Sequence, residues 1–273
     1  MKKLLQIYEN KLITNVKNFS DKYYYFYNHD NQIFGIEKTI SKKEYELIKL
    51  SYQEKKIYNT NNEIQRIYEF LYDNKEINKK NKVKVIIFEN NVDISETIID
   101  MLEELYQILI IDYKDLKVGF IFNHFDIDVE ELFQTLSQDL QQDIYVHNGP
   151  FLQDIKGNEL LTYIESYKSS RIRQKSNSDI TDLLFEVNLK NHLEFIQICS
   201  KLIIKPIEEH IDLIKVLFKN DLNVLKTSKE LYLNRNSVLF KLDIIHQKTG
   251  INIQKFKGAC AIKILIAYNN YNK

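Results

Sequence analysis

The spacing of the apolar residues changes once along this 273-residue chain, and this change limits the possible folds more than any other feature. Between residues 82 and 165, short apolar runs alternate with stretches of helical periodicity, in the order strand, helix, strand, strand, helix, strand. After a polar segment at 169–178, the chain has helical periodicity throughout. The sequence therefore predicts an α+β region followed by an all-α C-terminal region.

The first 80 residues are predicted to form a mixed segment that begins with a β-hairpin. Tyr23–Tyr27 and Ile33–Ile36 are strand-like runs, and the polar residues 28–31 between them predict a turn. Ser41 precedes Glu44 by three residues, which is the spacing of a capping box at the start of a helix. A strand with one buried face explains the aromatic run Tyr23–Tyr27 better than a ligand pocket or a stacking platform does.

The middle region is predicted to form a sheet covered by helices on one side. The expected strands are Val83–Phe88, Leu109–Asp112, Val118–Phe122 and Ile144–His147, and the expected helices are Ser95–Tyr106 and Val129–Leu140. The sequence Asn148-Gly149-Pro150 predicts a turn after the last strand. The polar segment 169–178 predicts a linker. The predicted divisions are 1–80, 82–165, 169–204 (linker and connecting helices) and 205–273.

The charges are distributed unevenly, although the formal net charge is zero. From Lys201 to the end there are 13 Lys and Arg against 6 Asp and Glu, and the first 200 residues hold 25 against 32. A basic end on an acidic body indicates polyanion binding or chance segregation. No signal peptide or apolar run of membrane-spanning length is present, so a cytoplasmic location without membrane contact is expected.

The region from residue 209 to residue 250 carries the functional prediction. Three helices are expected: the first at Ile211–Lys219, a second capped by Asn223, and a third at Arg235–Lys248. Asn234 caps the third helix, and Gly250 ends it. The residues expected to lock the second and third helices together are Val224, Ser228, Leu231, Leu233, Val238 and Leu242.

The third helix would then present its opposite face to a DNA major groove. The residues expected on that face are Arg235, Asn236, Leu239, Phe240 and Lys241, and those expected to reach phosphates are Lys226, Thr227, Lys229 and Ser237. Asn234, directly before the helix, is also expected to contact DNA. Arginine reads guanine and asparagine reads adenine. Three-helix units of this kind also occur in proteins that bind no nucleic acid, so pattern and charge alone leave both readings open.

Residues 227–242, together with Ile244 and Thr249-Gly250, resemble the C-terminal motif of PucR/CdaR-type regulators. They are also similar to the C-terminal helices of the nucleoid protein Fis. The resemblance covers about 45 residues, with a looser match back to Phe195. The chain departs from the family motif at four positions, where Asn234 replaces His, Ser237 replaces Thr, Phe240 replaces Tyr and Lys241 replaces Arg. Lysine lacks the bidentate geometry of arginine, so the contact at position 241 is expected to differ.

The resemblance implies a bacterial transcriptional regulator with a C-terminal helix-turn-helix that binds double-stranded DNA as a homodimer. It also implies a degenerate GGDEF-like middle domain. The turn at Asp112–Asp115 lacks the paired glycines that admit a phosphate, so we expect this domain to be non-catalytic and to serve dimerisation or sensing of an unknown effector. No catalytic residue, cofactor or metal site is expected, because the six histidines and the two cysteines, Cys199 and Cys260, lack ligand spacing.

Two other functions remain open. The first is an interaction or adaptor protein whose helix-turn-helix no longer binds DNA. The second is a nucleotide-linked enzyme that uses the middle domain. Weak salt dependence in a DNA titration would favour the adaptor, and nucleotide turnover would favour the enzyme.

Overall fold

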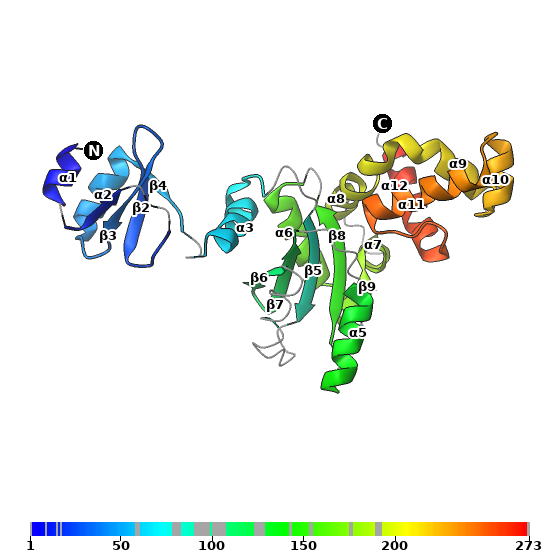
Figure 1. Cartoon of the computed structure of the whole chain (residues 1–273), viewed down its shortest axis with the longest axis horizontal. Coiled ribbons are helices and arrows are strands. Elements are labelled where there is room, and N and C mark those ends of the chain that lie inside the picture. Colours follow the sequence, from blue (N-terminus) through cyan, green and yellow to red (C-terminus); the bar gives the residue numbers. More distant parts are fainter. Residues whose placement is uncertain are drawn as a thin grey trace. The chain divides into compact units, whose positions relative to one another are not determined.

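The structure is a computed structural model that forms two compact units, Met1–Ile77 and Asn78–Lys273 (Figure 1). The residues it describes are 2–8, 10–14, 16, 18–57, 61–77, 83–89, 99, 108–122, 129–141, 144–152, 155–174, 177–188 and 193–271. Each unit contains its own sheet. The predicted helix at Ser95–Tyr106 lies outside the described residues except for Ile99.

The first unit contains a four-stranded sheet in the order β1-β3-β2-β4, in which all neighbours are antiparallel. Its strands are β1 (Leu12–Thr14), β2 (Tyr23–Tyr27), β3 (Ile33–Glu37) and β4 (Gln53–Lys55). The predicted hairpin is confirmed as β2 and β3. Its turn forms because the Asn28 side-chain oxygen accepts hydrogen bonds from the backbone N–H groups of Asp30 (2.9 Å) and Gln32 (2.8 Å).

The helices of the first unit are α1 (Lys2–Ile7), α2 (Lys42–Ser51) and α3 (Asn62–Asp73). Of these, α2 and α3 begin directly after the capping residues Ser41 and Asn61. The predicted capping box is present: the Ser41 hydroxyl accepts from the Glu44 N–H, and the Glu44 carboxylate accepts from the Ser41 N–H at 2.8 Å. Ile48 of α2 packs in one core cluster with Phe26 and Phe34 of the sheet. The sheet and α2 thus bury their apolar faces against each other.

The second unit contains a five-stranded sheet in the order β6-β7-β5-β8-β9. Its strands are β5 (Val83–Glu89), β6 (Ile108–Tyr113), β7 (Leu116–Ile121), β8 (Val146–Leu152) and β9 (Asn177–Asp179). The first three neighbouring pairs are antiparallel, and only β8 and β9 run parallel. The four predicted strands correspond to β5–β8, which confirms a mixed α and β region before the C-terminal helices.

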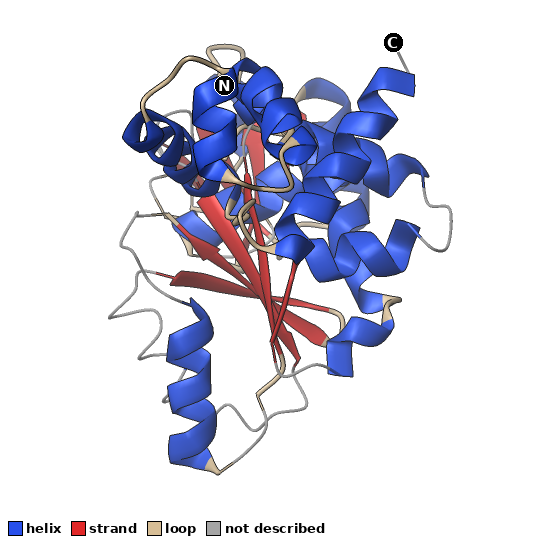
Figure 2. Ribbon diagram, turned by 90° about the vertical axis from the view of Figure 1, so that its right-hand side faces the viewer, coloured by secondary structure: helices blue, strands red, loops and turns tan. Residues whose placement is uncertain are grey.

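Helices pack on both faces of this sheet (Figure 2), which corrects the prediction of one covered face. The helices concerned are α5 (Val129–Leu140), α6 (Gly157–Lys168) and α7 (Ile180–Asn188). Val146 of β8 belongs to one core cluster with Phe133 of α5. The next residue, His147, bonds to Tyr163 of α6 instead. Because consecutive strand residues point to opposite faces, α5 and α6 must cover different faces.

The sequence Asn148-Gly149-Pro150 lies inside β8, so the predicted turn at this position is wrong. The pairing of β8 with β5 shifts register here, with Phe151 opposite Lys84 but Asn148 opposite Ile86. A Cβ atom on Gly149 would lie 2.7 Å from the carbonyl oxygen of Val85. Glycine and proline therefore mark a bulge in a continuing strand, where the ladder needs no N–H from proline.

The polar segment 169–178 is also structured, in contrast to the predicted linker. It forms a 3₁₀ helix, η1 (Arg171–Gln174), and most of strand β9. Ser178 of β9 is 4% exposed, and its hydroxyl lies 2.9 Å from Nδ1 of His147. The Ser178 side chain therefore faces a partner inside the unit rather than solvent.

The C-terminal region is all-helical, as predicted. Its elements are α8 (Leu193–Ile203), η2 (Lys205–His210), α9 (Ile211–Lys219), α10 (Val224–Glu230), α11 (Arg235–Thr249) and α12 (Phe256–Tyr271). Ser200 of α8 donates to the Asn269 side chain of α12 at 2.6 Å. Lys257 of α12 forms ion pairs with Asp179 of β9 and Asp182 of α7 at 2.9 and 2.7 Å. The helical region is thereby fixed to the sheet.

Candidate nucleic-acid interface

Asparagine side chains cap the N-termini of α10 and α11, as predicted. The side chain of Asn223 accepts a hydrogen bond from the Lys226 N–H at 3.0 Å and begins α10. Asn234 accepts one from the Asn236 N–H at 2.8 Å and begins α11. Gly250, with φ 75°, ends α11 in the left-handed conformation that glycine adopts without steric cost.

The connection between α10 and α11 contains a residue that the sequence did not single out. Tyr232 has φ 53°, and the N–H of Leu233 donates to the Ser228 carbonyl at 2.9 Å. This is a Schellman motif in which tyrosine occupies the position that glycine usually takes. Tyr232 is 95% exposed. Leu233 is 38% exposed, so the prediction that it points inward is wrong.

The inner face of α11 packs as predicted. Val238, Leu242 and Ile245 are buried, and Ser228 of α10 is 4% exposed. A small residue at this point lets α10 and α11, which contact each other, approach closely. Thr227 is fully buried, and its hydroxyl donates to the Asn223 carbonyl at 2.9 Å. Thr227 therefore cannot reach a phosphate, which corrects the prediction made for it.

Most of the residues predicted to contact DNA lie on the outer side of α10 and α11, away from the buried face. The exposed ones are Lys226, Lys229, Asn234, Arg235, Asn236, Ser237 and Phe240. Leu239 and Lys241 are half-buried. The caps and the packing of α11 thus bring nine of the ten predicted residues to the surface on two successive helices and the turn between them.

The electrostatics of this surface favour a polyanion. Within the part of the chain that the structure describes, Lys226, Lys229, Arg235 and Lys241 form no ion pair with an acidic side chain. In contrast, the neighbouring Glu230 is bound by Lys219 at 2.6 Å, and this hydrogen bond lowers the pKa of its carboxyl.

Glu209 is held in the same way as Glu230. Its carboxylate pairs with Lys248 of α11 at 2.7 Å, and the hydrogen bond from Lys248 lowers its pKa. The first turn of α11 contains no acidic residue. The partial positive charge of this helix N-terminus is therefore not neutralised locally. Cations without acidic partners and an uncompensated helix N-terminus together attract phosphate groups.

One exposed acidic residue on α11 was missed by the sequence reasoning. Asp243 lies seven positions after Asn236 and three after Phe240, and all three side chains are exposed. Residues three, four and seven apart share one face of a helix. That spacing was visible in the sequence, so the periodicity that placed Phe240 on the outer face also places Asp243 there.

Ion pairs hold the carboxylates at the turn between β6 and β7, where the sequence lacks paired glycines. Asp115 binds Lys168 at 2.5 Å and Arg173 at 2.9 Å, and the hydrogen bond from Lys168 is the main cause that lowers the pKa of Asp115 to about 2. Asp112 pairs with Lys117 at 2.8 Å. The carboxylates of this turn bind cations of the protein, so the turn is less free than the solvated loop that we predicted.

His147 lies at the centre of a buried hydrogen-bond network in the second unit. Its Nδ1 atom lies 2.9 Å from the Ser178 hydroxyl, and its Nε2 atom lies 2.7 Å from the Tyr163 hydroxyl. The residue is 0% exposed, and burial lowers its pKa to about 3. A neutral imidazole enclosed in this way has no access to a substrate and serves to join β8, β9 and α6.

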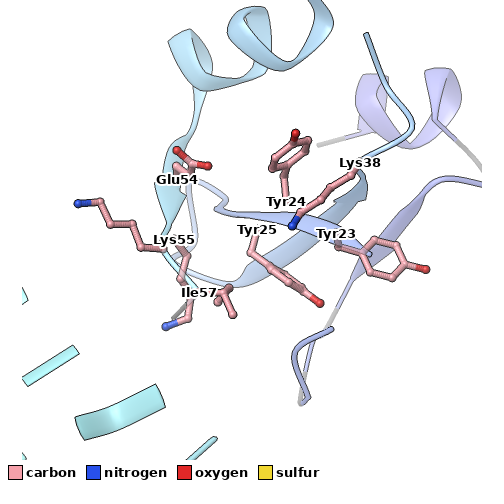
Figure 3. A pocket seen from close by; sticks show the side chains of 8 residues that line it. Tyr23, Tyr24, Tyr25, Lys38, Glu54, Lys55 and Ile57 are labelled. Carbon is pink, nitrogen blue, oxygen red and sulfur yellow. The ribbon is translucent and has the colours of Figure 1, made fainter. Parts of the chain in front are cut away.

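The first unit has an open hollow of about 340 Å³ beside the aromatic strand β2 (Figure 3). It is lined by Tyr23, Tyr24, Tyr25, Lys38, Glu54, Lys55, Lys56 and Ile57. Tyr25 and Phe26 are almost fully buried. Because consecutive strand residues point to opposite faces, both faces of β2 are covered here, which corrects the prediction of one buried face. The ammonium group of Lys38 lies 5.5 Å from the centre of the Tyr24 ring.

The functional groups of the hollow are bound within the unit. The Glu54 carboxylate accepts a hydrogen bond from the Tyr45 hydroxyl at 2.7 Å, and Lys55 pairs with Glu69 of α3. Among the described residues, no group of three or more His, Cys, Asp or Glu side chains has the arrangement of a metal site. None of the described helices combines the length and apolarity that crossing a bilayer demands.

Comparisons with known proteins give two partial similarities. No family model matches the chain. An uncharacterised protein, YxkF, of Bacillus subtilis (strain 168) is 40% identical over 55 residues, which are 20% of this chain and 17% of that protein. The match thus spans about one sixth of the length of this curated relative.

The second similarity is to a solved structure, that of a regulator of polyketide synthase expression from Bifidobacterium adolescentis. The alignment covers 77% of this chain and 93% of that chain, with 11% identity and a TM-score of 0.38. A TM-score of this size does not establish a shared fold.

Proposed function

We propose that the chain is a sequence-specific DNA-binding regulator of transcription, in which α10 and α11 form a helix-turn-helix. The observation that carries this proposal is the surface at the start of α11. There, Arg235 and Asn236 are exposed beside three lysines, Lys226, Lys229 and Lys241, and none of these four cations forms an ion pair with an acidic side chain among the described residues. The resemblance of residues 227–242 to the PucR/CdaR motif supports the same reading.

Each part of this surface has a role that follows from its chemistry. Arg235 donates two hydrogen bonds to guanine, and Asn236 exchanges two with adenine, in the major groove. The lysines and Ser237 bind phosphates and fix the position of the helix on the duplex. Asn234 caps α11 by accepting a hydrogen bond from the Asn236 N–H, and the other N–H groups at this helix N-terminus are available to a phosphate. Thr227 has no role in binding, because its side chain is buried.

We further propose that two copies of the chain act together on a palindromic site. One short helix contacts too few base pairs to select a site in a genome, and two copies of α11 about 34 Å apart read two half-sites on one face of the duplex. We assign the sheet of the second unit a non-catalytic role in dimerisation or in sensing an effector. The pairing of Asp115 with Lys168 and Arg173 supports this assignment.

The test is a titration of the full chain with duplex DNA that it selects from a random pool. Arg235→Ala is expected to abolish the preference for the selected duplex and to leave the fold unchanged, because Arg235 is exposed. Lys42→Ala, in the exposed first turn of α2, is the matched control and should bind as the wild type does. Retained preference in Arg235→Ala would contradict the proposal.

The salt dependence of the same titration separates a regulator from an adaptor protein. Three lysines per protomer in contact with phosphates predict a slope of log affinity against log salt of about −2.7 for one protomer and about −5.4 for a dimer. The double variant Lys226→Gln/Lys229→Gln should reduce the slope by about 2 per protomer. A slope near zero would favour the adaptor function.

A further inference from the structure

Four exposed side chains form a row along the outermost line of α11. Asn236, Phe240, Asp243 and Gln247 follow one another at intervals of four, three and four residues, and all are exposed. The buried residues Val238, Leu242 and Ile245 lie on the opposite side of the helix. Because intervals of three and four residues keep side chains on one face, this row points directly away from the core.

Phe240 stands in the middle of the row and is 66% exposed. It lies one helical turn after Asn236, which is about 6 Å along the helix axis. The base pairs of a duplex are stacked about 3.4 Å apart, so a residue at that distance meets a base one or two steps from the one that Asn236 contacts. Because Phe240 shares the outer face of α11 with Asn236, it faces the bases of the groove wherever Asn236 does.

We propose that Phe240 recognises the 5-methyl group of a thymine in the same half-site in which Asn236 binds an adenine. This inference rests on the proposed DNA-binding function. Thymine carries the only methyl group in the major groove of unmodified DNA, and an apolar ring packs against it. The half-sites therefore contain an adenine and a thymine one or two steps apart.

The charges around the row argue for duplex DNA rather than an apolar protein partner. Arg235 and Lys241 are adjacent to the row on α11, and Lys226 and Lys229 lie on α10. An exposed apolar ring on a surface that also carries four cations is complementary to a groove in which apolar methyl groups lie between two rows of phosphates. A protein partner for the same surface would need acidic residues around an apolar pocket.

The experiment compares thymine with deoxyuridine, which pairs identically but lacks the methyl group. The full chain selects a duplex from a random pool, and each thymine of the selected half-site is then replaced by deoxyuridine, one position at a time. At one position the affinity of the wild type is expected to fall about fourfold per half-site, the free energy of one buried methyl group. Phe240→Ala should bind the thymine duplex less tightly and lose this difference between the two bases.

Phe256→Ala is the matched control, because Phe256 is 81% exposed and lies at the start of α12, outside the row. This variant should keep the fourfold difference. Equal affinity of the wild type for thymine and deoxyuridine at every position would overturn the inference and leave the DNA-binding function intact. The same holds if Phe240→Ala still distinguishes the two bases. A chain that selects no duplex at all would overturn both proposals.

Discussion

At the scale of single residues, two helices end with a non-glycine residue in the left-handed position that glycine usually occupies. The chain contains only six glycines. The helices α9 and α10 both end in Schellman motifs, with Asp221 (φ 51°) and Tyr232 (φ 53°) in the left-handed position. A residue with a side chain pays roughly 1–2 kcal/mol in this conformation. Tyr232 does not recover that cost by packing, because it is 95% exposed. Its position beside the start of α11 points to a role at the proposed interface.

Tyr232→Gly is therefore expected to raise the free energy of unfolding by about 0.5–1 kcal/mol, because glycine removes the steric strain at this position. Urea denaturation measures the change. Tyr232→Ala is the control, since alanine removes the ring but keeps the strain. If the glycine and alanine variants are equally stable, the backbone at Tyr232 is not strained. A loss of DNA affinity in both variants would show that the Tyr232 ring contacts the DNA.

At the scale of elements, α11 combines two faces with different tasks. Its buried face, with Val238, Leu242 and Ile245, holds it against the rest of the helical region. Its outer face carries Asn236 and Phe240. The caps at both ends keep the helix from fraying, so the spacing of the outer residues is fixed. The element is therefore suited to present side chains at defined intervals along a groove.

Asp243 places a negative charge on the outer face of α11, where it would repel phosphates. Asp243→Asn is expected to increase the affinity for the selected duplex about fivefold at low salt, because it removes a charge that repels nearby phosphates, worth about 1 kcal/mol in water. Asp212→Asn, the same change at an exposed position in the first turn of α9, should have no effect. Weaker binding of Asp243→Asn would show instead that the carboxylate accepts a hydrogen bond from cytosine.

At the scale of the whole molecule, buried polar contacts join elements that are distant in the sequence. In the second unit, Lys257 ties α12 to β9 and α7, and His147 ties β8 to β9 and α6. Burial keeps His147 neutral in the folded protein, with a pKa of about 3. In the unfolded chain its pKa returns to about 6.5. The stability of the protein must therefore depend on pH below neutrality.

The contribution of neutral His147 is complete above about pH 6.5 and is lost as the pH falls, because the unfolded chain then binds a proton that the folded protein excludes. His147 by itself should lower the free energy of unfolding by about 1.4 kcal/mol per pH unit between about pH 6 and pH 5, above the pH at which glutamate carboxyls titrate. Urea denaturation at a series of pH values measures this slope.

His147→Gln should reduce the slope, since glutamine can bond to Ser178 and Tyr163 without titrating. Burial also lowers the pKa of His210, which contributes in the same direction, so part of the slope should remain. His246→Gln, an exposed substitution on α11, should leave the slope unchanged. An unchanged slope in His147→Gln would contradict the assignment.

Much of the helical structure follows from the sequence alone. The bounds of α9 and α5 match the predicted Ile211–Lys219 and Val129–Leu140, and Asn223, Asn234 and Gly250 stand at the predicted helix ends. These signals are local, because a cap or a run of apolar residues acts on neighbours within a few positions. The outer face of α11, including Phe240, follows from the same periodicity.

Strand partners and burial were decided only by the tertiary structure. Asn148-Gly149-Pro150 continues β8 because its bulge lies opposite Val85, more than sixty positions earlier in the chain. The polar segment around Ser178 becomes β9 because β8 lies beside it. Thr227 is buried because the packing around α10 encloses it. Each of these outcomes depends on residues far away in the sequence. A local sequence pattern does not indicate where such residues lie in the folded protein.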